Sequence, residues 1–141
     1  MRLIQGLNRA VTINAGGTAT VFRDRRWNWA EVAGRIARLA GGLAGLGIGR
    51  GDRVAILALN SDRYWEAMYA IPGLGAIMVP LNTRLAPPEI AFMLADSGAR
   101  ALIVDDNFAG MPGQLAGQMG EVAHVIHIGE AATPQIGRAH V

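Results

Sequence analysis

Uninterrupted apolar runs, separated by stretches with helical periodicity, restrict the fold of this chain more than any other feature. Residues 54–59 read VAILAL and residues 101–104 read ALIV, with no polar residue in either run. A strand with one face in water alternates apolar and polar residues, whereas a strand of a parallel sheet is apolar on both faces. The two runs therefore predict buried parallel strands that need helices over both faces of the sheet.

The segment before the first run predicts a hairpin and a helix. Residues 19–29 alternate around a polar Arg-Asp-Arg-Arg centre, which is typical of a hairpin with its turn near Asp24. Asn28 precedes Glu31 by three residues, the spacing of a capping box, and Gly47 is placed to end the helix. Between them, apolar residues recur at intervals of four and three, as on one face of a helix: Val32, Ile36, Leu39, Leu43 and Leu46.

The alternation of elements continues along the chain. Further helices are expected at about 62–71, at 87–97 and in a glycine-rich stretch around 108–119, and further strands at 75–81 and 122–129. In the helix that begins with Pro87 and Pro88, the expected buried face consists of Ile90, Met93 and Leu94. Strands that alternate with helices through short links predict right-handed crossovers. The fold class is therefore α/β, with an N-terminal hairpin and an open, mostly parallel sheet flanked by helices.

Composition excludes several kinds of site. The chain has no cysteine, so it has no disulfide, thiolate metal site or cysteine nucleophile, and all 13 basic residues are arginine, which excludes a Walker-type loop ending in lysine. The net charge of +2 is too small to indicate a nucleic-acid partner, despite a sequence pI of 9.9. No apolar run has the roughly 18 residues of a membrane span, and the N-terminus lacks the apolar core of a signal peptide. We therefore expect a cytoplasmic protein without a transmembrane segment.

Most polar and aromatic residues match structural functions better than catalytic ones. Asp105 and Asp106 follow a core strand, where we expect them to cap the next helix. His124 and His127 are three residues apart on a strand, so they point to opposite faces and are poorly placed to share a metal ion. The tryptophans are expected to be core residues: Trp27, Trp29 and Trp65. We therefore expect no metal site and no catalytic residue in this chain.

A polar tripeptide between prolines is the exception. Residues 79–89 read VPLNTRLAPPE and place Asn82, Thr83 and Arg84 directly after a predicted strand. Asn82 is expected to form a turn that positions Arg84. A guanidinium group offers several coplanar donors and suits a phosphate. In the structural alternative, Arg84 binds a carbonyl group or pairs with Glu89.

Several blocks of sequence, in order, carry a family resemblance: WNWAEVAGRIARL, GLGIGRGDRVAILALN, GAIMVPLNTRL and LADSGARALIVDD. With these blocks, residues 17–130 resemble the N-terminal part of the adenylate-forming, AMP-binding acyl-CoA synthetases, particularly fatty-acid–CoA ligases. The resemblance implies that a carboxylic acid and ATP form an acyl-adenylate and pyrophosphate, and that the thiol of CoA then displaces AMP to give a thioester. It also implies ATP, Mg²⁺ and CoA for the full-length enzyme, and it makes residues 19–130 a partial AMP-binding-type α/β subdomain.

The catalytic motifs of that family are absent from this sequence. They are a loop rich in Ser, Thr and Gly that ends in Lys, a Tyr-Gly-x-Thr-Glu type motif, and a Lys near the far C-terminus. Such cations offset the charge that develops when a carboxylate attacks an α-phosphate. The resemblance therefore implies the first subdomain of a longer enzyme, inactive alone and partnered by the other subdomains of the same chain. In related CoA ligases the Arg of the P-L-N-x-R loop lies near the CoA nucleotide, which implies that Arg84 contacts a CoA phosphate.

Other functions are compatible with the same residues. One is a non-catalytic α/β binding or interaction module, and another is an adenylate-forming relative that loads a carrier protein. An unrelated flavodoxin-like nucleotide binder would need a phosphate loop after the first strand, where the sequence offers only Ser61 and a helix start.

Neither end of the chain is assigned a helix or strand. Residues 1–18 are expected to be a lead-in to the hairpin, and residues 131–141 a tail. The last six residues, 136–141, can be encoded by ATCGGAAGAGCACACGTC, which matches a common sequencing-library adapter. We therefore expect residues 136–141, with Arg138 and His140, to be adapter read-through. The alternative is an ordinary flexible terminus.

Overall fold

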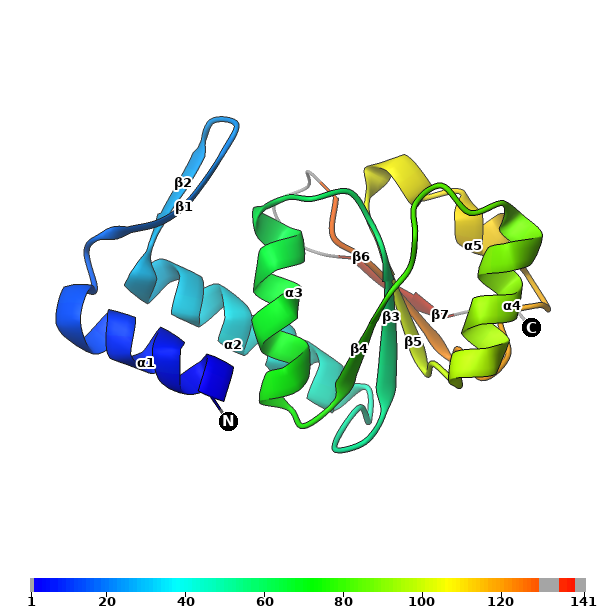
Figure 1. Ribbon diagram of the computed structural model, residues 1–141, viewed down its shortest axis with the longest axis horizontal. Helices are drawn as coiled ribbons and strands as arrows, with labels where there is room; N and C mark the ends of the chain where they lie inside the picture. Colours follow the sequence, from blue (N-terminus) through cyan, green and yellow to red (C-terminus); the bar gives the residue numbers. More distant parts are fainter. Residues whose placement is uncertain (1, 130–134, 139–141) are drawn as a thin grey trace. The chain divides into compact units, whose positions relative to one another are not determined.

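A computed structural model describes residues 2–129 and 135–138, with helices and strands in the alternating order expected of an α/β chain (Figure 1). The helices are α1 (Arg2–Asn14), α2 (Trp29–Gly45), α3 (Asp62–Gly73), α4 (Pro87–Ser97), the 3-10 helix η1 (Asp106–Phe108) and α5 (Met111–Gln114). The strands are β1 (Thr18–Phe22), β2 (Arg25–Asn28), β3 (Arg53–Leu57), β4 (Ile77–Pro80), β5 (Ala101–Val104), β6 (His124–His127) and β7 (Gln135–Arg138). Among the helices of the described residues, none combines the length and apolarity needed to span a bilayer.

The chain divides into two compact units. Unit 1 consists of Met1–Gly49 and Asn60–Gly75, and unit 2 consists of Arg50–Leu59 and Ala76–Val141. Unit 1 holds the hairpin and the first three helices, whereas unit 2 holds the larger sheet and the remaining helices.

Unit 2 is built on a five-stranded sheet with the order β4-β3-β5-β6-β7. The first four strands are parallel, as the apolar runs predict, and β7 is antiparallel to β6. In the register of the sheet, Val54 of β3 lies opposite Met78 of β4 and Ala101 of β5. The strand order places β4 at one edge of the sheet and β3 between two partners.

Both faces of the central strands are buried, which explains the absence of polar residues there. The side chains of Val54, Ala55, Ile56 and Leu57 are all fully buried. The core on one face of the sheet combines β3 and β5 with α4 and the segment after it: Ala55, Leu57, Leu81, Ile90, Leu94, Ala99, Leu102, Val104, Leu115, Met119 and Val122. Each large apolar side chain buried in this way contributes roughly 1.5–3 kcal/mol.

Helix α4 begins and ends as predicted, but its buried face is narrower than expected. Pro87 and Pro88 open the first turn, and Gly98 ends the helix with a φ of 68°. Ile90 and Leu94 are fully buried, whereas Met93 is 37% exposed. The prediction of a buried Met93 is wrong because positions four residues apart face the sheet and position 93 lies beside that line.

The glycine-rich helix predicted at 108–119 is replaced by two short pieces, η1 and α5. Gly110, Pro112 and Gly113 lie within this stretch, and both residue types weaken a helix interior. Gly120 follows with a φ of 58°, and a Cβ atom built on it would lie 2.8 Å from Cα of Ala95 in α4. The turn therefore requires glycine, because the backbone approaches α4 closely there.

The prediction that the tail contains no strand is wrong for Gln135–Arg138, which form β7. Backbone pairing explains this outcome, because the free edge of a strand offers N–H and C=O groups to any extended segment that reaches it. Residues 130–134 and 139–141, including His140, lie outside the described residues.

In unit 1, the hairpin and α2 form as the sequence predicts. Strands β1 and β2 are antiparallel, with Phe22 opposite Arg25 across the turn. The capping box is complete, because Asn28 Oδ1 accepts from the Glu31 N–H at 2.7 Å and Glu31 Oε1 accepts from the Asn28 N–H at 3.0 Å. At the other end, Gly47 has a φ of 86° and Ile48 donates its N–H to the carbonyl of Leu43, which completes a Schellman motif.

Helix α1 occupies most of the stretch expected to be a lead-in. Its inward side chains Ile4 and Leu7 pack with Val32 and Ile36 of α2. The helix was missed because it contains Gly6 and has no acidic residue in its first turn, so the usual start signals are absent. Packing of its apolar face, and not a local start signal, accounts for its formation.

A buried carboxylate ties the hairpin to α3. The Asp62 carboxylate accepts hydrogen bonds from Nε and Nη2 of Arg25 at 3.0 and 2.7 Å, and from the indole N–H of Trp27 at 3.0 Å. Burial raises the pKa of Asp62, but the hydrogen bonds from Arg25 and Trp27 and the Arg25 charge outweigh burial and bring the pKa below its usual value of 3.8. The ionised form of Asp62 therefore stabilises unit 1.

We expect Asp62→Asn to lower the free energy of unfolding by about 3–5 kcal/mol at pH 7, because it removes the buried negative charge on which the hydrogen bonds from Arg25, Trp27 and the Arg63 backbone converge. Since the pKa of Asp62 is lowered by folding, its stabilisation is present above the usual pKa and is lost as the pH falls through the folded-state value. Urea unfolding at several pH values checks this, with the exposed Asp24→Asn as the control, expected to change stability by less than about 0.5 kcal/mol. Equal effects of the two substitutions would contradict the account.

Candidate functional site

The loop after β4 holds the cation that the sequence singles out. Leu81 is buried and donates its N–H to the carbonyl of Ile56 at 2.9 Å, which fixes the start of the loop on the sheet. Asn82 Oδ1 then accepts from the Arg84 N–H at 2.9 Å, and the Asn82 carbonyl accepts from the Leu85 N–H at 3.2 Å. This is a turn closed by an Asn side chain, as predicted, and it determines where Arg84 projects from the loop.

The side chain of Arg84 is exposed, and within the described part of the chain it makes no hydrogen bond or ion pair. Glu89, the partner considered in the structural alternative, is engaged elsewhere, because its Oε1 accepts from the Ala86 N–H at 3.0 Å. That bond satisfies one of the free N–H groups at the start of α4. The guanidinium group is therefore available to an anion from solution.

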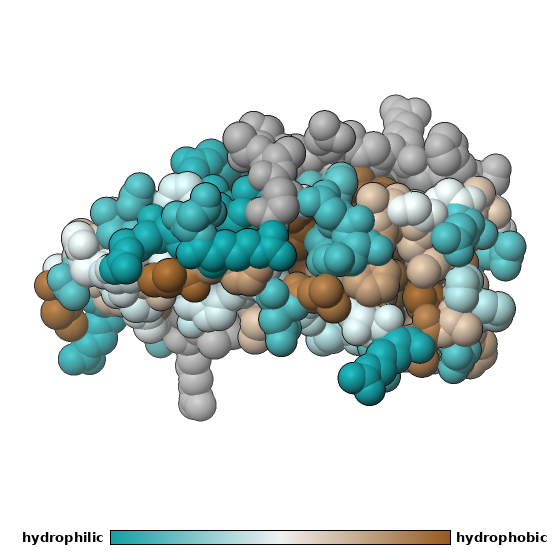
Figure 2. All heavy atoms as spheres, turned by 90° about the horizontal axis from the view of Figure 1, so that it is seen from above, coloured by the Kyte–Doolittle hydropathy of each residue, from teal (hydrophilic) through white to brown (hydrophobic). Residues whose placement is uncertain are grey.

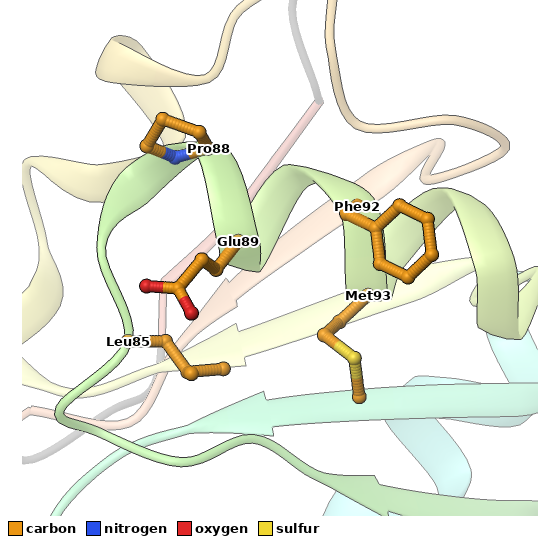
Figure 3. Close-up of a pocket in the computed structure, with 5 residues that line it drawn as sticks. All are labelled: Leu85, Pro88, Glu89, Phe92 and Met93. Carbon is orange, nitrogen blue, oxygen red and sulfur yellow. The ribbon is translucent and has the colours of Figure 1, made fainter.

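Residues that follow Arg84 in the chain line an open groove of about 320 Å³. It is lined by the loop residue Leu85 and by the first two turns of α4: Pro88, Glu89, Phe92 and Met93 (Figure 3). Phe92 is 65% exposed, so a large apolar side chain of this groove lies open to solvent. Figure 2 shows apolar and polar side chains interspersed over the face of the molecule in view.

Besides the Arg84 loop, polar side chains lie at the carboxyl ends of β3, β5 and β6. Asp105 Oδ1 accepts from the Asn107 N–H at 3.0 Å and caps η1, as predicted, and Oδ2 accepts from the Leu59 N–H at 2.9 Å. Nε2 of His127 lies 2.8 Å from Oδ1 of Asp106. Asp105 therefore joins the ends of two strands, which is a structural function.

His124 and His127 lie on β6 at positions that alternate between faces. No cluster of three or more His, Cys, Asp or Glu side chains within the described residues has the arrangement of a metal site.

The predicted association of the tryptophans with the core is confirmed, although all three are only half-buried. Trp27, Trp29 and Trp65 pack against the core of unit 1, and the rings of Trp29 and Trp65 lie 6.3 Å apart. Trp65 also contacts Tyr69, with ring centroids 4.7 Å apart.

Sequence reasoning missed a second buried ion pair in unit 1. The Glu66 carboxylate accepts hydrogen bonds from Nε and Nη2 of Arg35 at 2.7 and 3.2 Å, and Glu66 as a whole residue is only 4% exposed. Burial raises the pKa of Glu66 above its usual value of 4.5, and Arg35 compensates only in part. The available signal was the spacing of Asp62 and Glu66, which are four residues apart and share a helix face. Their partners lie 37 and 31 residues away, which no local pattern reveals.

The comparisons with known proteins agree with one another. The family described as AMP-binding enzyme matches residues 7–138. A long-chain-fatty-acid–CoA ligase from Thermus thermophilus is 41% identical over 107 residues, which are 76% of this chain and 20% of the relative. A feruloyl-CoA synthase from an Amycolatopsis species is 46% identical over 94 residues, which are 67% of this chain and 18% of the relative. The chain thus spans about a fifth of the length of these curated relatives.

Solved structures match over the same region. The anthranilate CoA ligase AuaEII in complex with anthranoyl-AMP has a TM-score of 0.83 at 32% identity, covering 89% of this chain and 24% of that protein. The N-terminal domain of FACL13 from Mycobacterium tuberculosis has a TM-score of 0.79 at 36% identity, covering 88% of this chain and 32% of that domain.

We expect Phe92→Gln to change the free energy of unfolding by less than about 0.5 kcal/mol, because the ring is largely exposed. Leu94→Ala, two residues away on the same helix, is expected to cost about 2–5 kcal/mol, because Leu94 is fully buried. Urea unfolding measures both variants. A cost for Phe92→Gln comparable to that for Leu94→Ala would show that the groove is part of the core.

Proposed function

The chain belongs to the family of AMP-binding enzymes, and we propose that it is the N-terminal part of an ATP-dependent acyl-CoA ligase. The observation that carries this proposal is the 41% identity to a long-chain-fatty-acid–CoA ligase over three quarters of the chain. In the proposed reaction, a carboxylic acid displaces pyrophosphate from ATP to form an acyl-adenylate. The thiol of CoA then displaces AMP and forms the thioester.

The names of the relatives support CoA as the acceptor. They include ligases or synthases for long-chain fatty acids, ferulate and acetate, each of which names CoA. Because the acids differ while the similarity persists, we assign this region to the part of the reaction that those enzymes share.

We propose that adenylation depends on residues beyond this chain. The charge that develops on the α-phosphate needs fixed cations or Mg²⁺ to offset it. This chain contains no lysine and no phosphate loop of the Ser/Thr/Gly type. Its own contribution in the proposal is the α/β scaffold and the exposed Arg84 in the loop between β4 and α4.

We propose that Arg84 contacts a phosphate of CoA. Three features of the loop support this assignment: the Asn82 turn that positions Arg84, the exposure of its guanidinium group, and the commitment of Glu89 to Ala86. A charge-assisted hydrogen bond contributes about 1.5–3 kcal/mol where water is partly excluded, but only about 0–1 kcal/mol at a fully exposed site. Ordered contacts from the rest of the enzyme would therefore determine how much Arg84 contributes.

We expect Arg84→Ala in the complete enzyme to raise the KM for CoA by about tenfold, because one charged contact to phosphate is lost. ATP–pyrophosphate exchange that depends on the carboxylic acid substrate does not require CoA, so its rate should be unchanged. The exposed Arg38 provides the matched control, since Arg38→Ala removes the same charge from another surface. An unchanged KM for CoA in Arg84→Ala would remove the assignment.

A further inference from the structure

One tryptophan connects the Arg25–Asp62 and Arg35–Glu66 ion pairs of unit 1. Trp27 donates its indole N–H to Asp62 at 3.0 Å, and the guanidinium group of Arg35 lies over its ring, 4.3 Å from the centroid. Arg35 in turn binds Glu66. A continuous chain of polar contacts therefore joins the hairpin, α2 and α3: Arg25, Asp62, Trp27, Arg35 and Glu66.

The two carboxylates of this network are bound unequally. Asp62 accepts at least four hydrogen bonds, two of them from Arg25, one from Trp27 and one from the backbone N–H of Arg63. Within the described residues, Glu66 accepts two hydrogen bonds, both from Arg35. Both side chains are almost completely removed from solvent, with exposed fractions of 0% for Asp62 and 6% for Glu66. Burial without enough donors makes an ionised carboxylate unfavourable.

We propose that this network is an acid-responsive junction, in which Glu66 gives up its charge, and with it the ion pair to Arg35, while Asp62 still holds the hairpin. A neutral Glu66 keeps its carbonyl oxygen as an acceptor for Arg35, so α2 and α3 stay in contact and the fold persists when the ion pair is lost. The inference does not depend on the proposed function, because it rests only on contacts inside unit 1.

The directions of the two pKa values support this order. Burial raises the pKa of Glu66, whereas the hydrogen bonds and the charge of Arg25 bring the pKa of Asp62 below its usual value. The charged groups that act on Glu66 are Arg35 from α2 and Asp62 and Arg63 from α3 itself.

Among the other elements of unit 1, α1 and β1 contribute apolar side chains to the shared core, and the hairpin contributes a cation that binds Asp62. Helix α1 contributes Ile4 and Leu7 to the shared core, and β1 contributes Ala19. From the hairpin, Arg25 binds Asp62.

The consequence for stability has a definite sign. Because the folded-state pKa of Glu66 is raised, its contribution is fully present below the unfolded-state pKa and is lost as the pH rises through the folded-state value. A neutral residue at position 66 should therefore match or exceed the wild type in stability at pH 7. This advantage should shrink as the pH falls through the pKa of Glu66.

Tryptophan fluorescence of the 141-residue chain tests the proposal. All three tryptophans, Trp27, Trp29 and Trp65, belong to unit 1, so the signal reports on this unit. Between pH 7.5 and pH 3 we expect a step with its midpoint above 4.5, the usual value for Glu, while far-UV circular dichroism stays constant through that step. The step should be lost in Glu66→Gln and retained in Glu121→Gln, which removes an exposed carboxylate of unit 2.

Three outcomes would overturn the proposal. The first is a step that persists unchanged in Glu66→Gln, and the second is a wild-type midpoint at or below 4.5. The third is a Glu66→Gln chain that melts at a lower temperature than the wild type at pH 7 or fails to fold, because the proposal requires that a neutral side chain be tolerated at this position.

Discussion

The pairing of β3 with two parallel neighbours is the constraint on which unit 2 depends. Its backbone groups are satisfied by β4 on one side and β5 on the other, and its side chains Val54–Leu57 are buried on both faces. A strand in this position tolerates no polar side chain, which explains the apolar run. Strand β3 also fixes the point at which the loop after β4 begins, because Leu81 donates its N–H to the carbonyl of Ile56. The position of the Arg84 loop therefore depends on the pairing within the sheet.

Local signals predicted most of this fold. The apolar runs located β3 and β5, the Asn28–Glu31 spacing located the start of α2, and the Pro87–Pro88 pair located the start of α4. These signals work because capping, turn formation and periodicity act over a few residues. The Asn82 turn was predictable for the same reason.

Features that depend on distant partners were not predictable. Helix α1 gains its stability from packing of Ile4 and Leu7 in the core of unit 1, and strand β7 from a free edge of β6. The partners of Asp62 and Glu66 come from the hairpin and α2, so the sequence showed charged residues without their pairing. The exposure of Met93 depends on which line of α4 meets the sheet, a tertiary property. Likewise, the sequence could not show that Glu89 binds the Ala86 N–H and so leaves Arg84 without an ion pair to it.

We propose that this chain supplies the α/β scaffold and the exposed Arg84, and that residues beyond this chain perform adenylation; the family membership and the lysine-free sequence are the observations behind this proposal. Acid-dependent ATP–pyrophosphate exchange, measured on the 141-residue chain and on the complete protein, tests this most directly. The account predicts exchange by the complete protein and none above background by the chain alone. Two results would contradict the account: exchange by the chain alone that depends on a carboxylic acid, or no exchange by the complete protein with any class of carboxylic acid tried.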